Sequence, residues 1–155
     1  MMQGVFSGVA CVAEKWLKIR GQWWYFFIAV DPPTSLPLHG ALLPTCTMGA
    51  CRWFLLGLKR KGYQPWALVT DGLKSYAGAI RSSFPQARHQ RCLFHVLQAA
   101  GRWLWEHMSD DDATRGRIRA ALSGLFRTWD RRTVWRRFER FQTHARGWRV
   151  TALAA

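Results

Sequence analysis

Hydrophobic and polar residues alternate along the first forty positions in the manner of β-strands. An alternating segment rich in β-formers at 5–19 leads into Arg20–Gln22, whose central glycine favours a hairpin turn. The aromatic and β-branched run 23–30 and the shorter segment 36–43 have strand length and are followed by prolines. The pattern therefore predicts three strands in an antiparallel meander.

The spacing of apolar residues then switches between helical and extended periods. Segments 47–61, 75–84 and 92–107 have helical spacing, and short strand-like runs at 66–70 and 87–90 separate them. The predicted order is β-β-β-α-β-α-β-α, which indicates an α/β fold with a mixed sheet.

Beyond residue 108 the whole chain has a helical pattern. Ser109 with the acids that follow it predicts one helix start, and Asp130 predicts another, because both residue types cap helix N-termini. Apolar residues lie on one side of these helices and arginines on the other. We expect two regions, a sheet-based core at 1–95 and an all-α, Arg-rich region at 96–155.

Lys and Arg outnumber Asp and Glu by 23 to 9 in the 155 residues, which gives a net charge of +14 and a pI near 11.0. Both regions are basic, with +8 over 1–95 and +6 over 96–155. Because 49% of the residues are apolar, the chain is expected to fold. A folded protein with this charge is expected to bind a polyanion, either nucleic acid or an anionic membrane surface.

Several classes of protein are excluded by simple counts. The longest strongly apolar run, Trp23–Val30, has eight residues and is too short to span a bilayer. The first ten residues contain no Lys or Arg, which argues against a secretory signal with a basic start. Four cysteines are too few to predict a disulfide framework. We expect a reduced, cytoplasmic protein.

The strongest local signal for chemistry is Thr70–Gly72. It places Asp71 at the carboxyl end of a short buried strand, where α/β sheets present ligands to solvent. A carboxylate in that position can hold Mg²⁺ together with waters and substrate phosphates. The alternative is an aspartate that stabilises the turn into the next helix.

Two blocks of sequence resemble the catalytic domain of DDE-type transposases of bacterial insertion sequences. The first block reads VAEKWLKIRGQWWY at 12–25 and AVD at 29–31; the second reads TDGLKSY at 70–76, FPQA at 84–87 and HQRCLFH at 89–95. The first is similar to the opening of that domain. The second is similar to the block around its second acid, with the Cys-x2-His ending of the Mutator-like groups.

This resemblance implies a fold, an activity and partners. It implies an RNase H-like fold for 1–95 and identifies 96–155 as part of a helical insertion. The implied function is DNA transposition and integration, by metal-dependent strand cleavage and transfer with Mg²⁺ as cofactor. The implied partner is DNA, as transposon ends or non-specific duplex, together with a second copy or a full-length transposase. No membrane partner is expected.

Carried over residue by residue, the resemblance makes Asp71 the second catalytic and metal-binding acid and places Cys92 and His95 near the site. Where the family has its first acid, this chain has Ala13, and no convincing third acid follows. Neighbours on a strand point to opposite faces, so Glu14 cannot simply replace that acid. Two-metal chemistry needs several carboxylates, and we therefore expect a truncated, catalytically inactive fragment.

Other interpretations remain open at this stage. The chain could be a non-enzymatic DNA-binding or regulatory protein that retains the transposase fold, or a nuclease that combines Asp71 with Glu14 or Asp31. His89, Cys92 and His95 form a His-x2-Cys-x2-His pattern that could indicate a zinc site, although a structural zinc site needs four ligands. Basic residues expected to contact DNA phosphates are Lys15, Lys18, Arg20, Lys74, Arg131, Arg132, Arg136 and Arg137.

Overall fold

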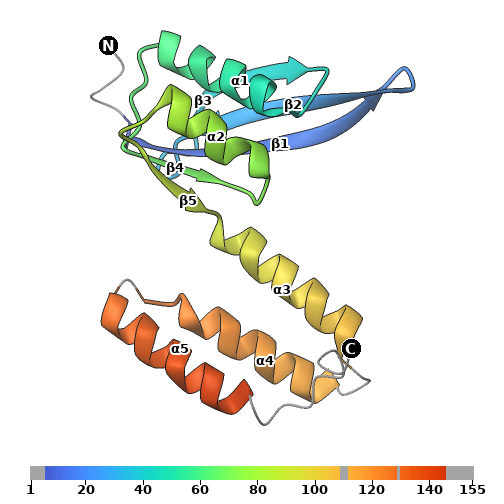
Figure 1. Ribbon diagram of the computed structural model, residues 1–155, viewed down its shortest axis with the longest axis vertical. Coiled ribbons are helices and arrows are strands. Elements are labelled where there is room, and N and C mark those ends of the chain that lie inside the picture. The colour runs from blue at the N-terminus through green and yellow to red at the C-terminus, as the bar shows by residue number, and fades with distance from the viewer. Residues whose placement is uncertain (1–5, 109–111, 129, 146–155) are drawn as a thin grey trace. The chain divides into compact units, whose positions relative to one another are not determined.

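Five strands form one mixed sheet in the N-terminal part of the chain, in the order β3-β2-β1-β4-β5 (Figure 1). The computed structural model describes residues 6–108, 112–128 and 130–145. The strands are β1 (Val9–Ile19), β2 (Gln22–Val30), β3 (Pro37–Leu43), β4 (Ala67–Thr70) and β5 (Arg88–Arg91). The first three pair antiparallel, whereas β4 runs parallel to β1 and β5 parallel to β4. The predicted α/β fold with a mixed sheet is confirmed.

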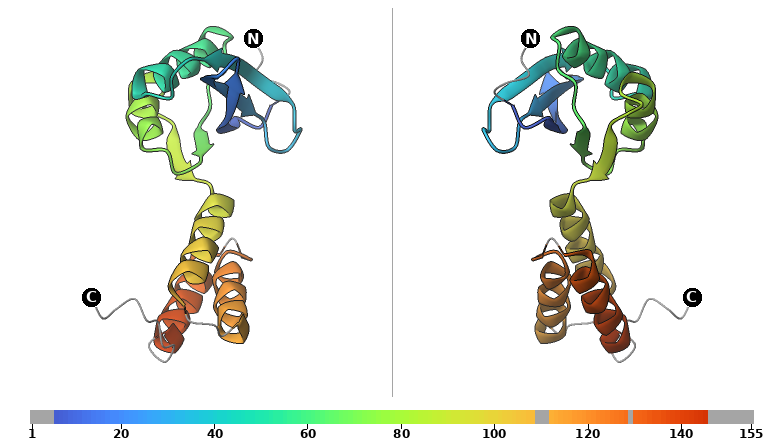
Figure 2. Two further views of the ribbon diagram at one scale, coloured as in Figure 1. Left: turned by 90° about the vertical axis from the view of Figure 1, so that its right-hand side faces the viewer. Right: turned by 90° about the vertical axis from the view of Figure 1, so that its left-hand side faces the viewer.

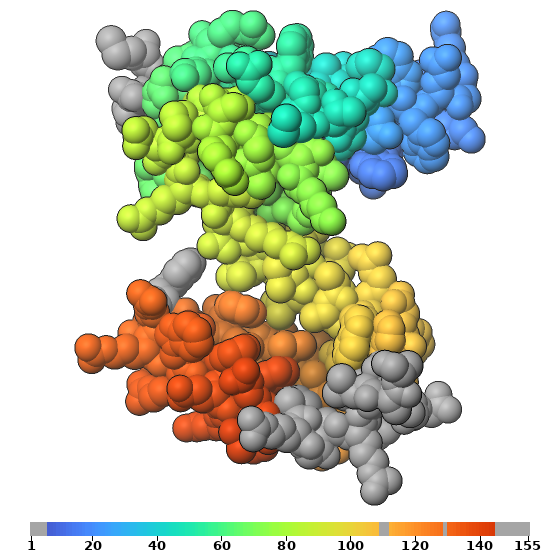
Figure 3. All heavy atoms as spheres, in the orientation of Figure 1, coloured from blue at the N-terminus to red at the C-terminus, as the bar shows by residue number. Residues whose placement is uncertain are grey.

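The β1–β2 hairpin turns through two residues with positive φ, Arg20 at 49° and Gly21 at 82°. Positive φ at both central positions is typical of the tight turns that match the right-handed twist of a hairpin. Glycine adopts this conformation without the steric cost that a side chain brings. The turn predicted at Arg20–Gln22 is therefore confirmed, and it ends a hairpin that projects beyond the neighbouring helix (Figures 1 and 3).

Two helices, α1 (Met48–Arg60) and α2 (Lys74–Ser83), cover one face of the sheet (Figure 2). Thr47 caps α1, because its hydroxyl accepts a hydrogen bond from the Ala50 amide at 3.3 Å. The core between sheet and helices is apolar and includes the fully buried Phe27 of β2, Phe54 of α1 and Tyr76 of α2. This packing fixes which side chains of β1 and β4 face the helices.

A second compact unit begins after Cys92 and is helical. It contains α3 (Leu93–His107), α4 (Asp112–Leu125) and α5 (Arg131–Ala145), around a small core of Leu104, Met108 and Ile118. Asp130 caps α5 as predicted, since its carboxylate accepts hydrogen bonds from the Thr133 amide and hydroxyl. The other predicted helix start, at 109–111, lies outside the described residues. No helix in the described part of the chain is long and apolar enough to cross a membrane.

Candidate functional site

Asp71 lies directly after β4, beside the middle of β1. Val12 and Thr70 are paired across the two parallel strands, so Ala13 and Asp71 are the next residues along each strand. The Asp71 side chain is half-buried, and its Oδ1 accepts a hydrogen bond from the Leu73 amide at 2.9 Å. Asp71 therefore lies at the end of the strand, as a metal ligand would, and also stabilises the turn into α2. The turn uses one of its two carboxylate oxygens.

Glu14 is the second acid of this region, and it faces the helices. The Tyr76 hydroxyl of α2 donates a hydrogen bond to Glu14 Oε2 at 2.9 Å. Burial raises the pKa of Glu14; hydrogen bonding to Tyr76 opposes this shift, while the negative charge of Asp71 adds to it. The negative charge of Asp71 therefore makes ionisation of Glu14 less favourable.

Ala13 lies on the opposite face of β1 from Glu14, as strand alternation predicts. It pairs with Ile28, whereas Glu14 pairs with the buried core residue Phe27. The position next to Asp71 on the neighbouring strand therefore carries a methyl group and no oxygen ligand. Glu14 does not occupy that position.

These residues do not fit a pair of magnesium ions. In the described part of the chain, no three His, Cys, Asp or Glu side chains come together as a metal-binding group. Two-metal catalysis of phosphodiester chemistry needs several carboxylates around ions about 4 Å apart. Asp71 and Glu14 supply two carboxylates, and Asp71 Oδ1 is already bonded to the backbone.

Asp31, the other acid considered for catalysis, has a structural role. Its fully buried carboxylate accepts hydrogen bonds from the Ser7 amide and hydroxyl at 2.8 and 2.6 Å, and from the Thr34 hydroxyl at 2.8 Å. Burial raises the pKa of Asp31, but the bonds from Ser7 and Thr34 outweigh it and hold the pKa below its usual value. Both oxygens are engaged in joining the chain before β1 to the turn after β2.

The predicted near-site residues fall on either side of the division between the units. Cys92 ends the first unit, and its amide donates to the Thr70 carbonyl at 2.6 Å, beside Asp71 in sequence. His95 lies on α3 in the second unit, and its Nδ1 is buried without a hydrogen-bond partner among the described residues. His89 Nε2 is bonded to the Thr70 hydroxyl at 2.8 Å. The described residues therefore offer no zinc cluster.

Most of the predicted DNA-binding residues are exposed. In the first unit these are Lys15, Lys18, Arg20 and Lys74, and on α5 they are Arg131, Arg132 and Arg136. Arg137 differs, because it is half-buried and its Nη1 donates to the Gly124 carbonyl at 2.6 Å. That bond ties α5 to the end of α4, so Arg137 is engaged within its own unit.

Two residues near Asp71 make contacts that the sequence analysis did not predict. One is Tyr76, which binds Glu14; the other is Arg91, whose guanidinium lies over Gly72. A Cβ at Gly72 would lie 2.5 Å from Arg91 Nη2, so a larger residue there would have to displace the exposed guanidinium. Neither contact follows from a local pattern in the sequence.

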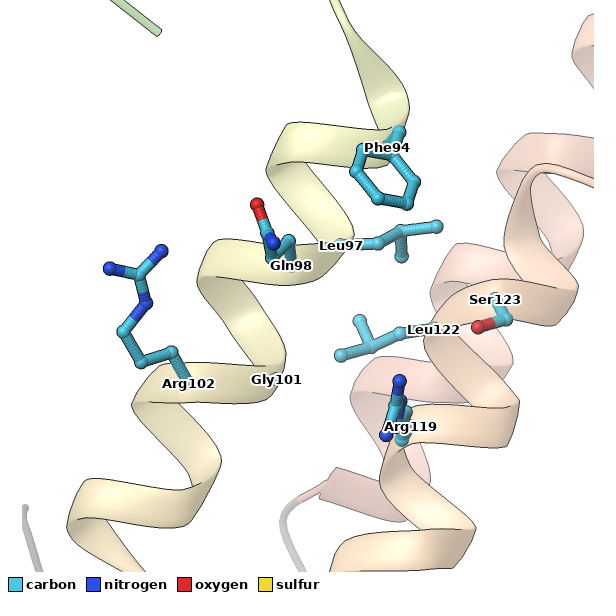
Figure 4. Close-up of a pocket in the computed structure, with 8 residues that line it drawn as sticks. All are labelled: Phe94, Leu97, Gln98, Gly101, Arg102, Arg119, Leu122 and Ser123. Carbon is cyan, nitrogen blue, oxygen red and sulfur yellow. The ribbon is translucent and has the colours of Figure 1, made fainter. Parts of the chain in front are cut away.

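The second unit contains a cavity of about 470 Å³ between α3 and α4 (Figure 4). Leu97 and Leu122 point toward one another there, whereas Arg102 points away. Its other lining residues are Phe94, Gln98, Gly101, Arg119 and Ser123. No acid, histidine or cysteine lines this cavity, so it contains none of the metal-ligating side chains predicted near Asp71.

Comparison with known proteins gives a family and several similar structures. The family described as a DDE domain matches residues 9–147. No curated protein matches the sequence. A chain of the simian T-cell lymphotropic virus intasome is similar, with 12% identity and a TM-score of 0.47, over 73% of this chain and 47% of that one. This chain therefore spans about half of that protein's length.

The HTLV-2 integrase catalytic core domain in complex with magnesium is also similar, in two forms. The trimeric form has 12% identity and a TM-score of 0.48, over 67% of this chain and 76% of that one. The dimeric form has 13% identity and a TM-score of 0.47, over 81% and 90% respectively.

Proposed function

The chain belongs to the DDE-domain family of transposases, and we propose that it acts in DNA transposition as a domain that binds DNA without cutting it. The observation that carries the proposal is Ala13 beside Asp71. The family's metal-dependent chemistry requires an acid at each of these positions, and here one of the two is a methyl group. The net charge of +14 supports DNA as the partner.

Magnesium in this family polarises the reacting phosphodiester and lowers the pKa of the attacking water or hydroxyl. This chain offers Asp71, with one oxygen engaged by Leu73, and Glu14, whose raised pKa makes it a poorer anionic ligand. Neither supplies the missing oxygen at position 13. We therefore propose that Asp71 stabilises the turn before α2 and raises the pKa of Glu14, and that this chain does not cleave DNA.

DNA binding by this chain is a matter of phosphate contacts. Lys15, Lys18 and Lys74 are exposed in the first unit, and the exposed arginines of α5 add a basic helix face in the second. Such contacts position a protein on DNA without reading its sequence. We propose that the domain occupies transposon ends or non-specific duplex, alone, with a second copy or with a full-length transposase.

The test uses the full chain with a fluorescently labelled duplex. Fluorescence anisotropy should show binding at low salt, and the affinity should fall by orders of magnitude between 50 and 200 mM salt, as about six or more phosphate contacts require. Incubation with supercoiled plasmid and Mg²⁺ or Mn²⁺ should leave the plasmid intact. Absence of binding at low salt, or nicking that Asp71→Asn abolishes, would overturn the proposal.

A second candidate is a nuclease that uses Glu14 together with Asp71, and the effect of the Asp71 charge on the pKa of Glu14, which requires the two carboxylates to lie close together, favours it. In that case the plasmid would be nicked, and both Glu14→Gln and Asp71→Asn would abolish the nicking. Exposed Glu106 in the second unit provides the matched control, because Glu106→Gln should have no effect.

A further inference from the structure

On one face of the β1–β2 hairpin, Trp16 contacts two other aromatic side chains, Trp23 and Tyr25. The ring of Trp16 lies 5.4 Å from that of Tyr25 and 6.4 Å from that of Trp23, with ring planes inclined at 73° and 71°. Trp16 and Trp23 expose 56% and 54% of their surface. We refer to these three residues as the aromatic ladder.

The position of the ladder follows from strand register. Trp16 pairs with Tyr25, and Glu14 pairs with Phe27, so the ladder continues the face that is covered by helices farther along the sheet. Phe27 is fully buried under α1 and α2, but the hairpin projects beyond α1 (Figures 1 and 3). Large aromatic surfaces grouped in the open are typical of binding sites.

The charges around the ladder are positive on its outer side. Lys18 Nζ lies 5.9 Å from the centre of the Trp23 ring, and Arg20 follows in the turn. At its inner end the ladder follows Glu14, which precedes Trp16 on the same face of β1. The surface is thus aromatic and cationic, and it leads from the hairpin tip toward the Glu14 and Asp71 region.

We propose that the aromatic ladder binds an unpaired DNA strand, with bases stacked on Trp16 and Trp23 and phosphates held by Lys18 and Arg20. The proposal rests on the proposed function, in which DNA is the partner, and it adds the form of DNA that this surface recognises. A duplex has its base faces stacked inside, whereas a single strand offers them to aromatic rings next to a cationic groove. The positive charges of Lys18 and Arg20 favour single-stranded DNA over an apolar protein surface as the partner.

The test measures anisotropy of a labelled oligo-dT strand and, separately, of a duplex. Trp16→Ala and Trp23→Ala should each weaken single-strand binding roughly 10-fold, because stacking contributes about 1–3 kcal/mol per base, and should leave duplex binding within about twofold. Trp53→Ala is the matched control, since Trp53 is 51% exposed and also has a cation, that of Arg60, 5.9 Å from its ring. Lys18→Ala should lower the salt slope for the single strand by about 0.7.

Thermal unfolding shows whether each alanine variant is folded. Trp16→Tyr is a further control, because tyrosine retains an aromatic ring and should retain most of the single-strand binding. Ultraviolet cross-linking of the unmodified chain to a bromouracil-substituted strand should map to a peptide within 15–25. Unchanged single-strand affinity in both alanine variants, or a cross-link elsewhere, overturns the proposal. The proposal is also overturned if Trp16→Ala abolishes self-association of the chain while single-strand affinity is unchanged. The aromatic ladder would then bind a second copy of the chain.

The outcomes also separate this proposal from the proposed function. Salt-dependent duplex binding with single-strand affinity independent of the ladder would overturn only the ladder proposal. Plasmid nicking dependent on Asp71, together with ladder-dependent single-strand binding, would overturn only the inactive assignment.

Discussion

Ala13 and Asp71 stand side by side at the first positions beyond the paired residues of two parallel strands. In this fold a carboxylate at each position would bring two acids to the same edge of the sheet. With alanine at position 13, β1 still pairs with a strand on each side. The absence of a carboxylate there is therefore compatible with an intact sheet.

Restoring that acid should create metal affinity. In Ala13→Asp, two adjacent carboxylates repel each other without metal, so the variant should unfold at a lower temperature than the unmodified chain. Mn²⁺ at about ten times its Kd should then raise its stability by about 1.4 kcal/mol. Thermal unfolding with and without Mn²⁺ measures this.

Two controls isolate the carboxylate pair. Ala13→Asn has the same shape without the charge, and Ala13→Asp with Asp71→Asn lacks the partner acid; neither should respond to Mn²⁺. An equal response of the unmodified chain would mean that Asp71 and Glu14 already bind the ion, contrary to the inactive assignment.

Glu14→Gln should stabilise the protein at neutral pH. Burial and the charge of Asp71 raise the pKa of Glu14 above its usual 4.5, so the folded state binds this proton more tightly than the unfolded state does. Stability is therefore lost as pH rises from about 4.5 through the folded pKa. Glutamine keeps an oxygen for the Tyr76 hydroxyl but carries no charge.

Urea unfolding at pH 7.5 and pH 4 measures the effect. The free energy of unfolding of Glu14→Gln should exceed that of the unmodified chain at pH 7.5, and the difference should shrink at pH 4. A difference independent of pH would show that packing, not charge, separates the two side chains. Glu106→Gln, at an exposed position, should change neither value.

Asp31→Asn should destabilise the first unit by about 2–3 kcal/mol. Asparagine has one carbonyl oxygen, so its NH₂ group must face donors from either Ser7 or Thr34. The pKa of Asp31 lies below its usual 3.8, so the stability from its ionised form is lost as pH falls below about 4.

Chemical unfolding at pH 7 and pH 3 checks this, and the cost of Asp31→Asn should shrink at pH 3. Asp112→Asn serves as control, because Asp112 is 83% exposed and pairs with Arg115 at the surface, where such a pair contributes about 0–1 kcal/mol. If both variants behave alike, Asp31 is not the link between Ser7 and Thr34.

The strands and helices could be predicted from sequence because burial of one face sets a local period. The strand predicted at 66–70 is observed at Ala67–Thr70, and the hairpin turn falls at Arg20 and Gly21. The opposite facing of Ala13 and Glu14 also followed from alternation alone.

The partners of the site residues could not be predicted in the same way, because they depend on contacts between distant segments. Tyr76 bonds to Glu14 across 62 residues, and Ser7 bonds to Asp31 across 24. Arg91 reaches Gly72 because β5 lies beside β4. No local spacing encodes these pairs. The bond from Tyr76 to Glu14 and the structural role of Asp31 could therefore not be predicted from the sequence.

Gly57→Ala should destabilise the first unit by about 1–2 kcal/mol, although alanine favours helices over glycine by about 1 kcal/mol. A Cβ at Gly57 would lie 2.4 Å from His39 Nε2, and the His39 ring is stacked on Phe54 at 4.8 Å and has little room to move. Gly49→Ala, earlier in α1, is the matched control: its Cβ would meet its nearest neighbour at 3.8 Å, so it should be neutral or stabilising. Adding His39→Ala to Gly57→Ala should remove the clash, so the double variant should be more stable than His39→Ala alone. Equal stability changes for Gly57→Ala and Gly49→Ala in urea unfolding would contradict the close contact between α1 and β3.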